Sequence, residues 1–157
     1  MAGEAGAPGS ILVEDARIAA NEALPGGHYL LRLDAPQIAA RALPGQFVHL
    51  RCGAELPLRR PLSILRATTR GEVEVLYKAV GQGTRLLASR QAGQTLSVLG
   101  PIGRPFELDP ARPRVLAIGG GVGMPPMLFL AQTLRRTAFR PLLLLGSEVA
   151  FPFQPKP

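Results

Sequence analysis

The sequence of 157 residues is poor in several residue types that particular functions require. It has no tryptophan, its aromatic residues make up 5%, and its only cysteine is Cys52. A single cysteine excludes an internal disulfide and a four-thiolate iron–sulfur cluster held by this chain alone. The shortage of aromatic rings argues against a base-stacking surface for single-stranded nucleic acid.

Long apolar runs and runs of like charge are also missing. No hydrophobic stretch reaches the roughly 18 residues that a membrane span requires. The first ten residues lack the cationic and then apolar pattern of a signal peptide, so we expect a cytoplasmic protein with no membrane contact. The formal net charge is +7, but the basic residues are scattered and no five like charges are adjacent, so we expect no nucleic-acid partner.

The usual catalytic groups are scarce as well. His28 and His49 lie far apart, and they do not form a metal-binding pattern with cysteines or paired carboxylates. No serine-elbow or cysteine–histidine motif of a hydrolase is present. Cys52 alternates with Val48 and Leu50, which predicts a buried core thiol. We therefore expect a bound cofactor to supply the chemistry.

Residues 11 to about 108 have the pattern of an all-β domain. Short alternating or apolar stretches are separated by glycine and proline turns, as is typical of a closed or sandwiched β architecture. The expected strands are 11–20, 28–33, 46–52, 62–67, 72–80 and 95–99, with a short helix at 84–89.

The pattern changes after Pro110. The apolar run 115–118 predicts a parallel strand buried on both faces. A glycine-rich turn, a helix through Arg136 and a second apolar strand at 141–145 follow, which together make one β-α-β unit. We expect a barrel domain at 1–110 and the beginning of a nucleotide-binding α/β domain at 111–157. Because a two-stranded parallel sheet is not stable alone, we expect more chain or a partner to cover it.

Two motifs of the β region could hold a ligand. In the segment Arg59-Arg60-Pro61-Leu62-Ser63, an arginine just before a strand can bind a phosphate, although two arginines beside a proline are also typical of a solvated turn. In the segment 76–84, the glycines would let a backbone approach a ligand, the amides at Thr84 could receive a pyrophosphate, and Tyr77 could pack on an aromatic ring. The alternative is a plain strand that ends in a glycine turn.

Two further glycine motifs lie near the domain boundary. Gly100-Pro101-Ile102-Gly103 predicts a tight turn at the end of the sixth strand. The segment 119–126 follows a buried strand and opens a helix, which is the context of a phosphate-binding turn. It is neither a Walker A loop nor the usual dinucleotide fingerprint, because Pro125 and Pro126 interrupt the spacing. A purely structural turn is the alternative.

Taken together and in order, these motifs resemble the ferredoxin–NADP reductase superfamily, and within it most resemble the electron-transfer subunits of dihydroorotate dehydrogenase. The resemblance covers about residues 11–148 and rests on five segments. They are Pro44-Gly45-Gln46-Phe47, Arg60-Pro61-Leu62-Ser63, Gly83-Thr84, Gly100-Pro101-Ile102-Gly103 and the glycine-rich segment 119–126.

The resemblance implies a six-stranded antiparallel Greek-key barrel that binds FAD, followed by an incomplete α/β nucleotide-binding unit. Arg60 would bind the flavin phosphate, Ser63 would lie near the reactive flavin nitrogen as the catalytic residue, and Pro61 and Leu62 would complete that motif. The remaining residues of the implied cofactor site are Leu76, Tyr77 and Lys78 beside the ribityl chain and ring, Gly83 and Thr84 at the pyrophosphate, and Gly120, Gly121 and Gly123 at a nicotinamide nucleotide.

The sequence departs from the family in one respect. The family's remaining nicotinamide-domain strands and its cysteine-rich iron–sulfur segment are absent, so we expect no iron–sulfur ligands in this chain. The implied function is electron transfer between NAD(P)H and a dehydrogenase catalytic subunit, for example in pyrimidine biosynthesis. The alternatives are a stand-alone flavin reductase and a non-catalytic module that docks a partner through its apolar segment 142–153. The choices between FAD and FMN and between NADH and NADPH stay open.

Overall fold

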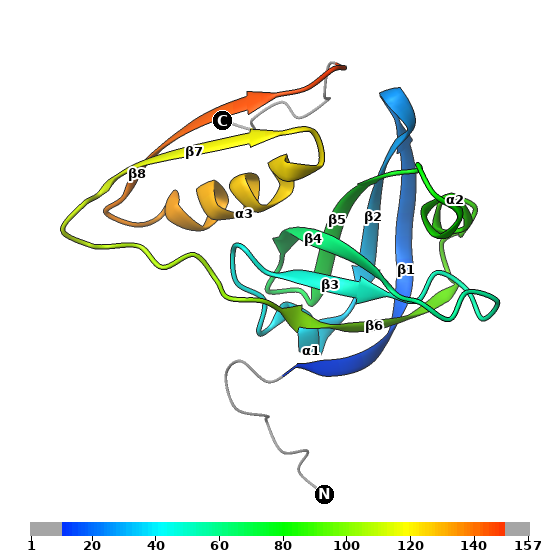
Figure 1. The fold of residues 1–157 in the computed structure, drawn as a ribbon. Coiled ribbons are helices and arrows are strands. Elements are labelled where there is room, and N and C mark those ends of the chain that lie inside the picture. The colour runs from blue at the N-terminus through cyan, green and yellow to red at the C-terminus, as the bar shows by residue number, and fades with distance from the viewer. Residues whose placement is uncertain (1–10, 150–157) are drawn as a thin grey trace, which may run out of the picture.

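The structure, a computed structural model, describes residues 11–149. Its larger unit is a closed barrel (Figure 1). The strands are β1 (Leu12–Leu24), β2 (His28–Asp34), β3 (Phe47–Leu50), β4 (Arg60–Ala67), β5 (Glu72–Lys78) and β6 (Thr95–Ile102). They are antiparallel and follow the order β1-β2-β5-β4-β3-β6 around the barrel, which confirms the expected six-stranded barrel.

Alternation along the strands gives the barrel its core. On β1, Ala16 and Ile18 are fully buried whereas Asp15 and Arg17 are exposed. Cys52 is fully buried in the same apolar cluster as Val48 and Leu50, as predicted. Short helices flank the barrel: α1 (Pro36–Ala39) contributes Ile38 to the core, and α2 (Gln82–Ala88) contributes Leu87.

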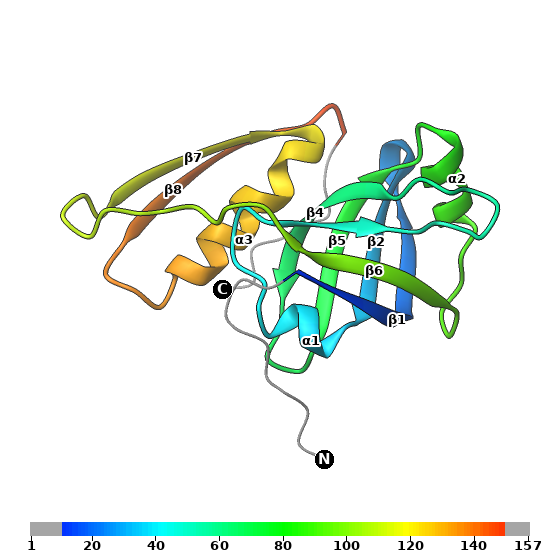
Figure 2. The ribbon, with the colours of Figure 1, turned by 60° about the horizontal axis from the view of Figure 1, so that its bottom comes forward.

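The smaller unit has two parallel strands and one long helix. Its elements are β7 (Arg114–Gly120), a 3-10 turn (Gly121–Gly123), α3 (Met124–Leu134) and β8 (Arg140–Gly146). The two prolines lie in the first turn of α3, where missing amide donors cost little. Figures 1 and 2 both place α3 between the β7–β8 sheet and the barrel, where it packs against β4. Phe129 of α3 joins the barrel's apolar cluster, so the two units share packing.

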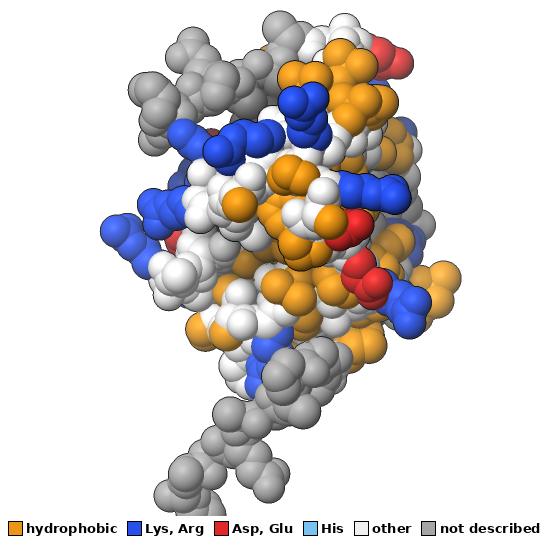
Figure 3. All heavy atoms as spheres, turned by 90° about the vertical axis from the view of Figure 1, so that its left-hand side faces the viewer, with side chains coloured by type: hydrophobic (Ala, Val, Ile, Leu, Met, Phe, Trp, Pro, Cys, Tyr) orange, Lys and Arg blue, Asp and Glu red, His pale blue; other side chains and the backbone are white. Residues whose placement is uncertain are grey.

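The face of the β7–β8 sheet that lies away from α3 carries exposed apolar side chains. Leu116 is the register partner of Leu142, and Ile118 is the partner of Leu144. All four side chains are at least 60% exposed. At the end of the molecule where this unit lies, apolar and basic side chains lie side by side (Figure 3).

Two local expectations were wrong. The segment 100–103 is not a turn throughout, because β6 continues to Ile102 and only Gly103 turns, with a φ of 94°. A side-chain carbon on Gly100 would come 2.8 Å from Val48 Cγ1, so this glycine permits close packing inside a strand. Strand β1 also runs to Leu24 rather than to residue 20, since a register shift between Ile18 and Ala20 lets it bend and keep pairing with β2.

Candidate functional site

Arg60 and the first turn of α2 lie against each other at one end of the barrel. Arg60 begins β4, opposite Leu50 of β3, and Gly83 lies in the first turn of α2. A side-chain carbon built on Gly83 would come 2.5 Å from Arg60 Nε, so the arginine side chain lies directly on the helix backbone. Among residues 11–149 no carboxylate forms an ion pair with Arg60. Its charge is therefore not neutralised by a neighbour in the described part of the chain.

Thr84 shapes the loop that leads into α2. Its Oγ1 accepts hydrogen bonds from the amides of Val80 and Gly81, both at 3.1 Å. The first amides of a helix have no intrahelical acceptor and carry a partial positive charge. The loop therefore presents backbone donors beside the Arg60 guanidinium, and this combination of a cation and amides suits a phosphate.

The other residues of the β4 motif divide between the two faces of the strand. Leu62 packs against the barrel core. Pro61 and Ser63 face outward, opposite His49 and Phe47 of β3. Ser63 is half-buried on the side of β4 against which α3 packs.

Tyr77 does not present its ring to a ligand in this structure. The side chain is 1% exposed, stacks on Tyr29 with ring centroids 5.4 Å apart, and donates its hydroxyl to Asn21 Oδ1 at 3.0 Å. Burial raises the pKa of the Tyr77 hydroxyl well above its ordinary value. The expectation that this ring packs on a cofactor is therefore not met.

Lys78 and the glycine turn after β7 line a shared cavity of about 460 Å³. The cavity lies at the carboxyl ends of β7 and β8, where open parallel sheets bind their ligands. Gly121 has a φ of 52°, a left-handed conformation that favours glycine. Gly123 precedes α3 and does not line the cavity. The lining residues are His28, Lys78, Gly120, Gly121, Val122, Gly146, Ser147 and Glu148.

Glu148 also lines this cavity, although no sequence motif singled it out. Its carboxylate lies 3.7 Å from Lys78 Nζ and so links the end of β8 to β5. The available signal was its position just after the apolar strand β8, since residues that follow a parallel strand gather at the ligand-binding edge. Leu76, beside Lys78 on β5, is 2% exposed and therefore cannot reach a ligand without movement of its neighbours.

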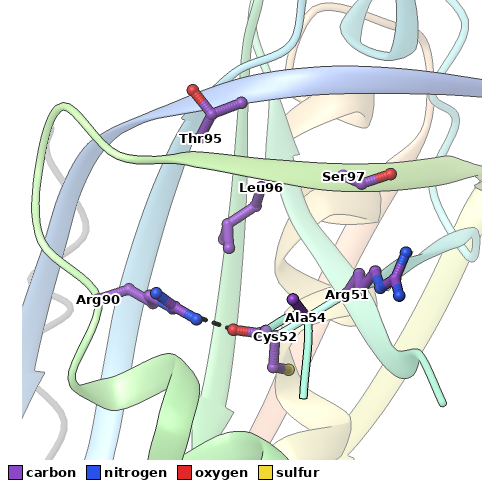
Figure 4. A pocket seen from close by; sticks show the side chains of 8 residues that line it. Arg51, Cys52, Ala54, Arg90, Thr95, Leu96 and Ser97 are labelled. Atoms are coloured by element: carbon purple, nitrogen blue, oxygen red, sulfur yellow. Dashed lines mark hydrogen bonds between the residues drawn. The ribbon is translucent and has the colours of Figure 1, made fainter. Parts of the chain in front are cut away.

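A second cavity of about 370 Å³ lies beside Cys52 (Figure 4). Its walls come from the segment after β3, from Arg90 after α2, and from the start of β6. Burial raises the pKa of the Cys52 thiol, and the nearby positive charges of Arg60 and Arg90 partly oppose this rise. The lining residues are Arg51, Cys52, Gly53, Ala54, Arg90, Thr95, Leu96 and Ser97.

The described residues hold neither a candidate metal site nor a helix that could cross a membrane. Within 11–149, no three or more His, Cys, Asp or Glu side chains group together in a way that could hold a metal ion. None of the helices in that range has the length and apolar character needed to cross a membrane.

Comparison with known proteins finds relatives that share one description. The electron transfer subunit of dihydroorotate dehydrogenase B (NAD(+)) from Desulforamulus reducens is 37% identical over 139 residues, which are 87% of this chain and 53% of that protein. The corresponding subunit of Bacillus caldolyticus is 39% identical over 125 residues, or 76% of this chain and 49% of that protein. The chain thus spans about half the length of the curated relatives it matches. No protein-family model matches it.

Solved structures show the same architecture. An NADH-dependent reduced ferredoxin–NADP oxidoreductase, described for flavin-based electron bifurcation, superposes with a TM-score of 0.78 and 27% identity over 86% of this chain and 49% of its own. The ferredoxin reductase of carbazole 1,9a-dioxygenase gives a TM-score of 0.73 and 28% identity over 87% of this chain and 43% of its own. The chain therefore belongs to the ferredoxin–NADP reductase superfamily and is a relative of the electron transfer subunits of dihydroorotate dehydrogenase B.

Proposed function

We propose that this chain binds FAD on its barrel and passes electrons between a nicotinamide nucleotide and a dehydrogenase catalytic subunit such as dihydroorotate dehydrogenase. The observation that carries the proposal is the contact between Arg60 and Gly83. It brings a cation with no ion-pair partner in the described chain next to backbone amides, and these two groups come from segments that the family resemblance assigns to one flavin phosphate.

The residues at this contact fit a phosphate in charge. A side chain at position 83 would occupy the space that the Arg60 side chain now fills, so glycine lets the guanidinium lie against the turn. Arg60 Nη1 donates to the carbonyl of Leu58 at 3.0 Å, which leaves the other guanidinium donors for a ligand. Thr84 holds the loop through its own hydroxyl, so its contribution to the phosphate would come from its backbone amide.

When bound, the flavin supplies the hydride and electron transfer. The protein's residues would bind and orient it: Arg60 with the loop 80–84 at the phosphate and Ser63 on the outer face of β4 towards the ring. Of the β5 residues 76–78, the half-buried Lys78 would lie along the ribityl chain. Gly120 and Gly121 would admit a nicotinamide nucleotide to the cavity beside Lys78, with Gly123 setting the start of α3.

The direct test is flavin binding by the purified chain. We expect added FAD to give the absorption spectrum of a protein-bound flavin after gel filtration. Arg60→Ala should weaken binding roughly ten- to a hundredfold, because a hydrogen bond to a charged group contributes about 1.5–3 kcal/mol. Arg70→Ala is the matched control, since Arg70 is exposed in the turn between β4 and β5. A wild-type chain that takes up no flavin would refute the proposal.

One observation also favours a second function, in which the chain docks a partner protein. The exposed apolar side chains of β7 and β8 form a continuous patch, and such patches mark association sites. The segment expected to take part extends to residue 153, and its part from 150 onward lies outside the described residues. A chain that binds no flavin yet forms a defined complex with a dehydrogenase subunit would support this alternative.

A further inference from the structure

The segment that follows β8 crosses from the small sheet to the barrel. Figures 1 and 2 both show the end of β8 directed towards the turn between β1 and β2. The residues Ser147, Glu148 and Val149 of this segment are here called the strap. Ser147 and Glu148 line the cavity of about 460 Å³ that also has Lys78 and the glycine turn after β7 in its walls. The strap therefore forms one wall of that cavity.

The strap contacts the barrel through two side chains of different character. The Glu148 carboxylate lies 3.7 Å from Lys78 Nζ at the end of β5. The Val149 side chain lies on the backbone of the turn between β1 and β2, because a side-chain carbon built on Gly26 would come 3.0 Å and 3.2 Å from its two methyl carbons. An ion pair and an apolar contact thus hold the strap against the barrel beside the cavity.

Both contacts are of a kind that opens at little cost. The Glu148 side chain is 90% exposed, and an ion pair this open to water contributes little stability and is screened by salt. Val149 is only half-buried, and its amide donates to Ser147 Oγ at 3.3 Å, within the strap itself. The opposite wall is firmer, since the glycine turn runs directly into α3, which packs on β4. The strap is thus the wall best able to move.

The charge of the strap makes it an obstacle to an anionic ligand. A nucleotide would bring its phosphates to the glycine turn at the start of α3, where backbone amide donors gather. Glu148 places a negative charge at the same cavity and pairs with Lys78, the cation that would otherwise attract a phosphate. Movement of the strap away from the barrel removes the repulsion and frees Lys78 in one step.

We infer that the strap is an autoinhibitory latch, which narrows the cavity while Glu148 pairs with Lys78 and admits a nucleotide only when residues 147–149 move away from the barrel. The inference rests on the proposed binding of a nicotinamide nucleotide in this cavity and adds a means of regulating it. A ligand binds more weakly when only a fraction of the protein is in the competent state. Loosening the latch should therefore raise the nucleotide affinity, and fixing it should prevent binding.

Locking the strap tests the latch on the full chain. Gly26→Cys with Val149→Cys places two sulfurs where the strap already touches the barrel, so that a disulfide would tie them together. Cys52 is fully buried and stays out of this reaction. The probe is NAD⁺, which does not react with an oxidised flavin, and its binding is measured by isothermal titration calorimetry. We expect the disulfide form to bind NAD⁺ at least about tenfold more weakly than the wild type, and reduction to restore the affinity to within about twofold.

A change that loosens the strap should act in the opposite direction. Glu148→Gln keeps the shape of the side chain but removes the charge that pairs with Lys78, so we expect NAD⁺ affinity to rise by about two- to fivefold. Glu107→Gln, at an exposed glutamate between β6 and β7, makes the same change in net charge away from the cavity and should leave the affinity unchanged. A fall in affinity for Glu148→Gln would overturn the latch, because the carboxylate would then bind the nucleotide instead of excluding it.

Uptake of FAD, followed separately by absorption, distinguishes the latch from the proposed electron transfer. A flavin-loaded double-cysteine variant that binds NAD⁺ equally before and after reduction, or whose two cysteines do not join, would overturn the latch and leave flavin binding intact. A chain that takes up FAD but binds no NAD⁺, even as Glu148→Gln, would also overturn it. If no flavin is taken up and the locked and reduced forms still differ as expected, the latch stands and the electron-transfer proposal fails. If the double-cysteine variant does not fold, the comparison of Glu148→Gln with Glu107→Gln decides alone.

Discussion

Arg59 and Arg60 are neighbours in the sequence, but their side chains have different partners: Arg59 lies just before β4 and Arg60 is its first residue. Arg59 donates to the carbonyl of Ser97 at 2.8 Å and to that of His49 at 3.2 Å, so it fastens β3 and β6 together. Arg60 turns towards α2 instead and has no such structural partners across the barrel. The alternative interpretation, in which the two arginines belong to a solvated turn, therefore fits neither residue, since both are only partly exposed.

Gly83 offers a test that separates cofactor binding from folding. Gly83→Ala would introduce a methyl group 2.5 Å from Arg60 Nε and so push the arginine side chain away. Gly83 is helical, and alanine in a helix is favoured over glycine by about 0.5–1 kcal/mol. We expect a melting temperature equal to or above that of the wild type, together with FAD binding weakened about tenfold. Weakened binding in a destabilised protein would instead point to general loss of structure.

The raised pKa of the Tyr77 hydroxyl predicts how the stability of the fold changes at alkaline pH. Its hydroxyl pKa is raised in the folded state, chiefly by burial, so the folded protein keeps this proton when the unfolded chain, near its ordinary pKa of 10.0, loses it. The stabilisation that the protonated Tyr77 hydroxyl gives to the fold is thus fully present below pH 10 and is lost as the pH rises above that value. The buried Cys52 thiol, with its raised pKa, acts in the same direction from about its ordinary value of 9.0 upward.

Urea unfolding at several pH values checks this expectation. Tyr77→Phe removes the hydrogen bond to Asn21 and should lower the free energy of unfolding at pH 7 by about 0.5–1.5 kcal/mol. Between pH 9 and 11 the wild type should lose stability more steeply than the variant. Parallel pH profiles for the two proteins would show that the Tyr77 proton plays no part.

At the scale of elements, the barrel depends on the close approach of β3 and β6. Gly100 of β6 faces Val48 of β3, and a methyl group at position 100 would come 2.8 Å from Val48 Cγ1. Val48 is fully buried and cannot move into solvent. Gly100→Ala should therefore destabilise the barrel by about 1–3 kcal/mol, the usual cost of overpacking a core.

A double-mutant cycle measures this contact directly. Val48→Ala opens space at the position where the new methyl group clashes, so the combined variant should be more stable than the sum of the two single effects predicts. Guanidinium unfolding of all four proteins provides the free energies. Strict additivity would mean that the Gly100→Ala penalty arises elsewhere than at Val48.

The same elements show what the sequence could and could not predict. Alternation located all six barrel strands, because one buried face imposes a period of two on the sequence. The same alternation places Tyr77 inside the barrel. Tyr77 is two residues from Val75 and four from Val73, both fully buried on β5, so the three side chains share one face of the strand. The cavity beside Cys52 had no such signal, since its walls come from three segments that are adjacent only after the barrel closes.

At the scale of the whole molecule, the two units differ in how fully their sheets are covered. The barrel closes on itself and leaves no open sheet edge. The β7–β8 sheet is covered by α3 on one face only, and Val115, Ala117 and Leu143 pack towards that helix's cluster. Parallel sheets are normally buried on both faces, so the opposite face of this unit is the part of the described chain best suited to association.

That face predicts how the isolated chain behaves in solution. Leu116 and Leu142 are 60% and 67% exposed and are register partners, so a charge at both positions divides the apolar patch at its centre. We expect the wild type to associate with itself as concentration rises, and Leu116→Lys with Leu142→Lys to raise the dissociation constant about tenfold or more in sedimentation equilibrium. Because both side chains point away from α3, the melting temperature should change little.

Leu58→Lys serves as the control for this double variant, since Leu58 is 71% exposed but lies in the loop before β4, away from the sheet. It adds the same kind of charge to a side chain that is just as open to solvent, so any general effect of a higher net charge on association appears in it too. An equal fall in association for Leu58→Lys would trace the effect to charge repulsion over the whole surface. A fall confined to the β7–β8 variant assigns it to the uncovered face of that sheet, because parallel sheets are normally buried on both faces.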